Sequence, residues 1–227
     1  PSTRLSGGGG NDVVRIGRLS SAAAPMTGTI DGGDDLDTIE AVASGSGGYL
    51  SPLNLQNLSI SNVEILNASA GVVAMAAQYE GFQSIVNASN KTLTLAAPGS
   101  VDFGTRLGSQ TYVTITGSSG NDEIAATGNF LTINGGEGDD TLSLLGNYGT
   151  LNGGGGVDTI SYAGSDKGVT IDLVSGTVVR AGDYSSSATF SSIENATGSG
   201  FDDRFIASAV ANAFNGGAGT DIVSYER

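Results

Sequence analysis

The chain of 227 residues contains no cysteine and no histidine. Without cysteine there is no disulfide framework, no thiolate nucleophile and no zinc–thiolate site. Without histidine the Ser-His-Asp triad, the usual general base and the histidine-bearing zinc motifs are excluded. Carboxylates therefore remain as the main ionisable side chains.

Positive charge and long apolar runs are also scarce. Nine Lys and Arg residues stand against 23 Asp and Glu residues, which gives a net charge of −14. Nine scattered cations do not predict a basic patch, so we expect no nucleic-acid partner. No run of about 18 apolar residues occurs, so we expect no membrane span. The excess negative charge would repel itself in a compact state, and divalent cations would relieve that repulsion.

Glycine, in contrast, is abundant. The chain has 37 glycines, roughly twice the ordinary share of about 7%. Hydrophobic residues still make up 38% of the sequence. This combination favours a solenoid with glycine turns over a disordered tail.

The glycines recur with acids at a fixed spacing between Gly117 and Ser161. Three glycine-acid turns begin at equal intervals, at 117–122, 135–140 and 153–158. An apolar residue follows each final aspartate by two positions, and the apolar row continues halfway between the copies; these residues are Ile124, Ile133, Leu142, Leu151 and Ile160. The underlying unit is thus a nonapeptide, which predicts stacked units that are too short and too glycine-rich for a helix.

Four further copies of the turn occur, at 7–12, 32–37, 198–203 and 216–221. The copy at 32–37 has Asp35 in place of the third glycine, and the copy at 198–203 has Ser and Phe at glycine positions. The last two copies begin two nonapeptides apart, and Gly198 follows Gly153 by a whole number of nonapeptides. Ordinary β-turns are the alternative interpretation, but seven copies, most of them evenly spaced, argue against it.

These turns resemble the calcium-binding nonapeptide repeat of the RTX (repeats-in-toxin) family, G-G-x-G-x-D-x-U-x, in which U is apolar. The resemblance implies an all-β fold, a right-handed parallel β-roll or β-solenoid, with calcium ions between neighbouring turns. Calcium takes six to eight oxygen ligands, and glycine lets a turn aim its carbonyls inward. The candidate metal-binding residues are Gly8, Gly10, Asp12, Gly33, Asp35, Asp37, Gly120, Asp122, Gly136, Gly138, Asp140, Gly154, Gly156, Asp158, Gly200, Asp203, Gly217, Gly219 and Asp221.

A coil of two nonapeptides also predicts which edge each turn occupies. We expect one edge to carry Asp122, Asp140, Asp158, Asp203 and Asp221. The apolar residues that should point into the roll are Ile124, Leu142, Ile160, Phe205 and Val223. The intervening turns at 127–131, 146–150 and 208–212 carry no carboxylate. They should form the opposite edge, which we expect to hold no calcium.

The sequence divides into three segments of what we expect to be one continuous solenoid. Residues 1–46 form an irregular calcium-turn segment, because the spacing of its two copies is out of register with the nonapeptide repeat of the later array. Residues 47–116 form acid-poor solenoid rungs, and residues 117–227 form an RTX-type β-roll with a strand pair inserted at about 162–197. Alternation of apolar and polar residues predicts the strand pair on the side of the roll. Further short strands are expected at 13–16, 38–42, 53–55, 58–60 and 92–95.

The acid-poor segment contains only three acids, Glu64, Glu80 and Asp102. Its segments 64–69 and 84–89 repeat one another after about 20 residues, a spacing that suits a rung of a parallel β-helix. The run 72–77 is compatible with a short helix, but its length favours a buried strand. Asn67 and Asn87 are either an inward-facing ladder or plain turn residues.

We therefore expect a calcium-binding structural module of a secreted or cell-surface bacterial protein. Members of the resembled family leave the cell unfolded by type I secretion and fold outside. The Asn-Ala-Ser rungs look like those of a surface-layer protein or adhesin, with self-assembly or a cell-surface polysaccharide as candidate partners. The alternative is a non-catalytic repeat region of an exoenzyme (protease, lipase, polysaccharide epimerase or lyase) whose active site lies elsewhere. We expect no catalysis by this chain, which reads as a fragment of a larger polypeptide, and interpret Asp102 with Arg106 as a solvated surface pair.

Overall fold

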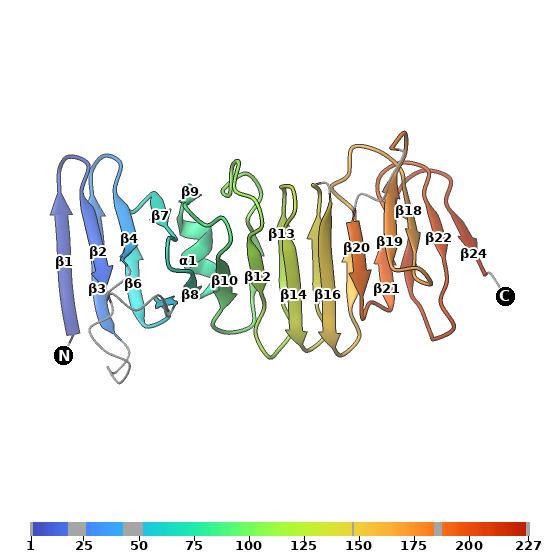
Figure 1. Ribbon diagram of the computed structural model, residues 1–227, viewed down its shortest axis with the longest axis horizontal. Coiled ribbons are helices and arrows are strands. Elements are labelled where there is room, and N and C mark those ends of the chain that lie inside the picture. Colours follow the sequence, from blue (N-terminus) through green and yellow to red (C-terminus); the bar gives the residue numbers. More distant parts are fainter. Residues whose placement is uncertain (1, 18–25, 43–51, 147, 184–187, 226–227) are drawn as a thin grey trace.

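The computed structural model describes residues 2–17, 26–42, 52–146, 148–183 and 188–225, and it is an elongated β-solenoid (Figure 1). Successive coils stack through parallel strand pairing, and only β18–β19 and β19–β20 pair antiparallel among the described residues. The expected all-β fold of stacked parallel coils is confirmed.

Four sheets form the faces of the solenoid. The long sheet contains β5 (Leu53–Asn54), β8 (Val72–Ala74), β10 (Thr92–Leu95), β12 (Thr114–Thr116), β14 (Thr132–Glu137), β16 (Gly149–Gly155), β18 (Val169–Asp172), β19 (Thr177–Arg180), β20 (Ala188–Ser191), β22 (Arg204–Ile206) and β24 (Ile222–Ser224). The six-stranded sheet contains β11 (Ser100–Asp102), β13 (Glu123–Ala126), β15 (Thr141–Leu144), β17 (Thr159–Ser161), β21 (Asn195–Thr197) and β23 (Phe214–Asn215). The three-stranded sheet contains β1 (Ser2–Gly8), β3 (Thr27–Gly33) and β6 (Leu58–Ser61), and the four-stranded sheet contains β2 (Val13–Gly17), β4 (Thr38–Val42), β7 (Ile65–Asn67) and β9 (Ser84–Val86).

The pairing register places like residues above one another, so that apolar columns fill the interior. Leu142 pairs with Ile124 and Ile160, and all three are fully buried. Alternate residues of a strand point to opposite faces, which keeps their neighbours outside. Phe205 is also buried as expected. Val223 pairs with Phe205 and so lies on the same inward face as predicted, but its side chain is 40% exposed. Val223 lies on β24, the outermost strand of the long sheet, where no further described coil covers it.

The coils change shape along the axis. The coil from β5 to β7 visits the long, three-stranded and four-stranded sheets in turn. In the next coil α1 (Ala76–Gly81) takes the place of a strand between β8 and β9. The backbone N–H of Met75 donates to the Gln78 side chain (2.8 Å), which supports the first turn of α1. The prediction of a strand over the whole run 72–77 is therefore wrong, because β8 ends at Ala74 and α1 begins at Ala76.

The inserted strand pair is present as β18 and β19, but not on the side of the roll. It lies within the long sheet, between β20 and β22. The two strands of this hairpin thus extend the long sheet, although in the sequence they come between β17 and β20. Within the described part of the chain, α1 is too short to cross a membrane, and no longer apolar helix occurs.

Candidate metal centre

The seven glycine-acid turns form three rows on two edges of the solenoid. The turns at 117–122, 135–140 and 153–158 follow long-sheet strands and lead into the six-stranded sheet; we call them the central row. The turns at 198–203 and 216–221 follow β21 and β23 and lead back into the long sheet, so this last row lies on the opposite edge. The first row, at 7–12 and 32–37, joins the three-stranded to the four-stranded sheet. Loops after β1 and β3 lie along the upper edge of Figure 1, and loops after β12, β14 and β16 along the lower edge.

The expectation that all five aspartates share one edge is therefore wrong for Asp203 and Asp221. Five strands, β17 to β21, lie between the turn at Gly153 and the turn at Gly198. Each strand runs from one edge of the solenoid to the other, so an odd number of them ends on the opposite edge. For the same reason the uncharged turn at 208–212, which leads from β22 to β23, lies on the edge of the central row.

The final aspartates of each row form a ladder of hydrogen bonds, which we call the inner ladder. Asp140 Oδ1 accepts from the Asp122 backbone N–H, and Asp158 Oδ1 accepts from that of Asp140, both at 2.8 Å. The same contact joins Asp37 to Asp12 (2.7 Å) in the first row and Asp221 to Asp203 (3.0 Å) in the last. Each carboxylate thus satisfies a backbone N–H of the coil before it.

Two glutamates that the sequence did not suggest complete these rows. Glu64 Oε2 accepts from the Asp37 N–H, and Glu194 Oε2 from the Asp158 N–H, both at 2.9 Å. Each glutamate stands within an Asn-Ala segment, at 64–69 and 192–197. The recurrence of that segment in the sequence is the signal that could have identified the coil that follows the last aspartate of each of these two rows.

A second set of side chains that accept hydrogen bonds between coils was also missed. The residue before the final aspartate, an unspecified position of the repeat, accepts from the backbone of the next coil: Asn121 from Asp139 N (3.0 Å), and Asp139 from Val157 N (2.8 Å). Asn11 and Asp202 make the same contact with Leu36 and Thr220. This outer ladder runs in the opposite direction to the inner one, so each turn is held to both neighbours.

Two conformations of the turn occur. Five copies hold their second and fourth residues in the left-handed region: Gly8 and Gly10, Gly33 and Asp35, Gly136 and Gly138, Gly154 and Gly156, Gly217 and Gly219. Ser stands at the second position of the other two copies, and neither this serine nor the fourth residue, Gly120 or Phe201, is in the left-handed region. There the Ser118 N–H donates to Asp122 Oδ2, and the Ser199 N–H to Asp203 Oδ2, both at 2.6 Å.

The glycine copies leave carboxylate oxygens buried without a partner. The Oδ2 atoms of Asp12, Asp37, Asp140 and Asp158 are inaccessible and accept no hydrogen bond. A methyl group at Gly135 would contact both Asp140 Oδ2 and, at 2.5 Å, the carbonyl oxygen of Gly153 in the next coil. Asp12, Asp37 and Asp158 repeat this arrangement beside the first glycines of their own turns, with the carbonyls of Gly32, Asn62 and Ser192. Two kinds of oxygen thus converge where only glycine leaves room.

The electrostatics of these positions are unfavourable without a positive charge. Burial raises the pKa of Asp140 from its ordinary 3.8 to about 6, and the carboxylates of Asp158, Asp122 and Asp139 add to the rise. Burial also raises the pKa of Asp158, with Glu194 and Asp139 contributing. Hydrogen bonds from the preceding coil oppose both shifts without cancelling them.

This donor set fits a hard cation such as calcium, because it consists of oxygens alone. No three acidic side chains converge on one point within the described residues. A cation here would therefore draw on one or two carboxylates together with backbone carbonyls, which suits calcium better than it suits zinc.

Two other predicted features differ in detail. Arg106 pairs with Glu80 (2.6 Å) rather than with the Asp102 carboxylate, and its guanidinium donates to the backbone oxygens of Phe82 and Asp102. Asn87 donates to Asn67 (3.0 Å), so the asparagine ladder exists, but it faces outward beside Glu40 rather than inward.

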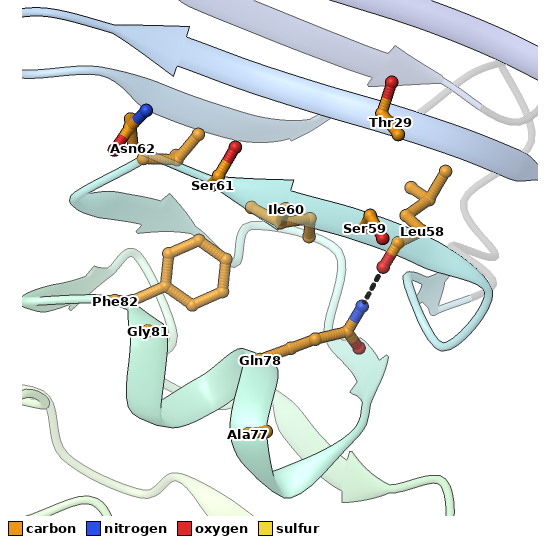
Figure 2. A pocket seen from close by; sticks show the side chains of 11 residues that line it. Thr29, Leu58, Ser59, Ile60, Ser61, Asn62, Ala77, Gln78, Gly81 and Phe82 are labelled. Carbon is orange, nitrogen blue, oxygen red and sulfur yellow. Dashed lines mark hydrogen bonds between the residues drawn. The ribbon is translucent and has the colours of Figure 1, made fainter.

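A groove between β6 and α1 offers no acid or base. Figure 2 shows the Gln78 side chain spanning it to donate to the Leu58 carbonyl (2.7 Å), with Ile60 and Phe82 beside it. Its lining consists of Thr29, residues 58–63, Ala77, Gln78, Gly81 and Phe82, none of which is ionisable. Acid–base catalysis has no candidate residue in this lining.

No protein-family model matches the chain, and no match was found among curated proteins.

Proposed function

We propose that this chain is a calcium-binding structural module of a secreted or cell-surface bacterial protein, and that it folds when it binds calcium outside the cell. The observation that carries the proposal is the set of four buried Oδ2 atoms, on Asp12, Asp37, Asp140 and Asp158, that lie beside carbonyl oxygens without a hydrogen-bond donor. A buried charge without a partner is costly, so these coils need a cation between them.

The residues that would hold calcium are these aspartates and the carbonyls that face them in the next coil. Bound calcium would supply the positive charge that neutralises the carboxylates. The inner and outer ladders position the turns, and the glycines leave room for the oxygens to converge. Asp122 and Asp203 belong to the first turns of the central and last rows. Each already accepts a backbone N–H at Oδ2, so this oxygen has a partner without calcium.

The location outside the cell follows from affinity. Extracellular calcium modules bind at about 10⁻⁴ to 10⁻³ M, which would leave such a module largely free of calcium in a cytosol. We also propose that the chain is not itself catalytic, so that an enzyme activity of the parent protein, if it has one, would lie in another region.

Calcium titration followed by thermal unfolding tests the proposal. Calcium should raise the melting temperature of the wild-type chain by several degrees or more. A variant with Asp12, Asp37, Asp140 and Asp158 changed to Asn should lose most of that rise. The matched control changes four exposed acids, Asp34, Glu123, Glu137 and Asp166, to their amides and thus removes the same charge. An absent calcium response in the wild type, or equal responses in the two variants, would contradict the proposal.

A further inference from the structure

Three aromatic side chains form an exposed stack on one edge of the solenoid. Tyr112 and Phe130 stack with ring centroids 5.2 Å apart and planes within 14°, and Phe130 and Tyr148 at 5.6 Å and 17°. Their exposed fractions are 58%, 42% and 58%. Each ring stands in the turn that leads into the long sheet, before β12, β14 and β16, so the stack lies on the edge opposite the central row.

The backbone at these positions disfavours aromatic residues. Their φ angles are 57°, 56° and 59°, in the left-handed region that bulky residues rarely adopt. Asn90 occupies the equivalent position one coil earlier with φ 59°, and asparagine tolerates this conformation. The other non-glycine residues with positive φ in the described part of the chain are small and polar, namely Asp35, Asn62, Asn87, Asn90 and Ser192. Three strained, solvent-facing aromatics in consecutive coils therefore point to a function for the rings.

The long sheet presents uncharged side chains beside the stack, and the exposed Glu137 lies farther away, at the end of β14. Its outward residues on β10, β12, β14, β16 and β20 form two columns, which are Thr92, Thr114, Thr132, Thr150 and Thr189, and Thr94, Thr116, Asn134, Asn152 and Ser191. None of the ten is charged and none is buried, although the chain carries −14. Three successive coils thus repeat one pattern outward: an aromatic ring, then threonine, then threonine or asparagine.

We propose that this threonine–aromatic face, made of the three stacked rings and the two columns, binds a neutral, extended polysaccharide that lies along the solenoid axis. Pattern units recur at the strand spacing of about 4.8 Å, close to the length of one sugar unit in an extended β-linked chain. Hydroxyl and amide groups can bond sugar hydroxyls. Because the three rings stack on one another, their edges form an apolar ridge that runs in the same direction as the polymer.

The charge distribution selects a neutral polymer over a charged one. An acidic polysaccharide would meet no cation in the two columns and would be repelled by the chain as a whole. A polycation would be drawn to the acidic turns on the edges instead. The proposal requires the folded solenoid but not a particular ion between its turns, so a chain that stays folded without calcium would still bind the polysaccharide, and the two proposals can fail separately.

Affinity electrophoresis of the calcium-saturated chain tests the proposal, with hydroxyethyl cellulose and a mixed-linkage β-glucan as neutral probes and polygalacturonate as the acidic one. We expect at least one neutral probe to retard the wild-type chain and polygalacturonate not to. The triple variant Tyr112→Asn, Phe130→Asn, Tyr148→Asn should bind about tenfold more weakly or worse; asparagine is chosen because Asn90 shows that the turn accepts it. The control Val174→Asn, Val210→Asn removes exposed apolar side chains elsewhere and should bind like the wild type.

A second variant keeps the test decisive if the triple variant is poorly folded. Thr132→Glu leaves the rings intact and places a charge in the middle of the face, so it too should weaken retardation by the neutral probe. The proposal is overturned if neither neutral probe retards the wild type, if polygalacturonate is preferred, or if Thr132→Glu binds normally. It is also overturned if sedimentation shows a dimer that the triple variant abolishes, since a second copy would then cover the face.

Discussion

At the scale of single residues, aspartates that look identical in the repeat have different surroundings. Asp122 and Asp140 occupy the same position of adjacent copies and are both buried. Asp122 Oδ2 accepts the Ser118 N–H, whereas Asp140 Oδ2 has no donor. The residue at the second position of the turn, Ser118 in one copy and Gly136 in the other, thus goes with the presence or absence of a hydrogen-bond donor at Oδ2.

Replacing Asp140 should weaken calcium binding more than replacing Asp221. Asp140 has an acidic turn on both sides and is 1% exposed, whereas Asp221 is half-buried and has a described neighbour on one side only. We expect Asp140→Ala to raise the midpoint of calcium-induced folding about tenfold or more, and Asp221→Ala to raise it less. Calcium titrations followed by circular dichroism measure both midpoints, and equal shifts would refute the stacking of sites between coils.

The calcium-free chain should become less stable as pH rises from about 4 to about 7. The pKa of Asp140 is raised to about 6 in the folded chain, so folding favours the protonated acid. This contribution to the free energy of unfolding is fully present below the pKa that Asp140 has in the unfolded chain. It is lost as pH rises through the pKa in the folded chain, and the loss is up to about 3 kcal/mol. Asp158 acts in the same direction.

Circular dichroism in chelator across this pH range measures the effect as the folded fraction that remains at each pH. Asp140→Asn should flatten the profile, because the amide does not titrate. With calcium present the trend should reverse, since protons compete with the cation for the carboxylate. A profile for Asp140→Asn as steep as that of the wild type would assign the pH dependence to other groups.

At the scale of elements, much of the fold could be predicted, because the nonapeptide spacing and the alternation of apolar and polar residues fix where the strands lie. The strands at Thr38–Val42 and Thr92–Leu95 have the predicted bounds, and the buried columns follow from the nonapeptide unit. The helix α1 could not be predicted, since it depends on Gln78 and on Tyr79, whose hydroxyl donates to the Val72 carbonyl inside the coil. The inner ladder was within reach of the sequence, but the outer ladder was not, because the repeat leaves its position unspecified.

The edge of each row was predictable in principle. The interval between Gly153 and Gly198 contains five strands, and that odd number places Asp203 opposite Asp158. The left-handed aromatics, in contrast, have no signal in the sequence beyond their even spacing at the length of one coil. Only the backbone angles show that they are held under strain.

The first glycine of a turn should be irreplaceable where a carboxylate shares its space. Gly135→Ala would place a methyl group against Asp140 Oδ2 and the Gly153 carbonyl oxygen, and Asp140 cannot withdraw without breaking its hydrogen bond from the Asp122 N–H. We expect a loss of about 1 to 3 kcal/mol in unfolding free energy in calcium, together with weaker calcium binding. The control is Gly155→Ala in the same row, where the methyl group meets only the end of the flexible Glu137 side chain. Denaturant unfolding with and without calcium compares the two, and a tolerated Gly135→Ala would show that the space near Asp140 is not used.

At the scale of the whole molecule, the acidic rows and the net charge of −14 should make the fold depend on divalent ions. Circular dichroism in excess chelator should lose most of the β signal, at least that of residues 117–227. Magnesium should restore less of the signal than calcium does, because it demands a stricter geometry and gives up its water reluctantly. A spectrum and melting temperature that chelator leaves unchanged would mean that the hydrogen-bond ladders suffice without metal.

The alternation of the rows between edges has a mechanical consequence. If all seven turns lay on one edge, drawing them together would shorten that edge and curl the rod toward it. Here the first and last rows tighten one side and the central row tightens the other. The bending moment of the central row opposes those of the first and last rows, so the rod should stiffen without a net bend to one side. Small-angle scattering should then give nearly the same maximum dimension for the saturated wild-type chain as the straight solenoid has, and a shorter, bowed profile when only the central row is disabled by Asp140→Asn and Asp158→Asn.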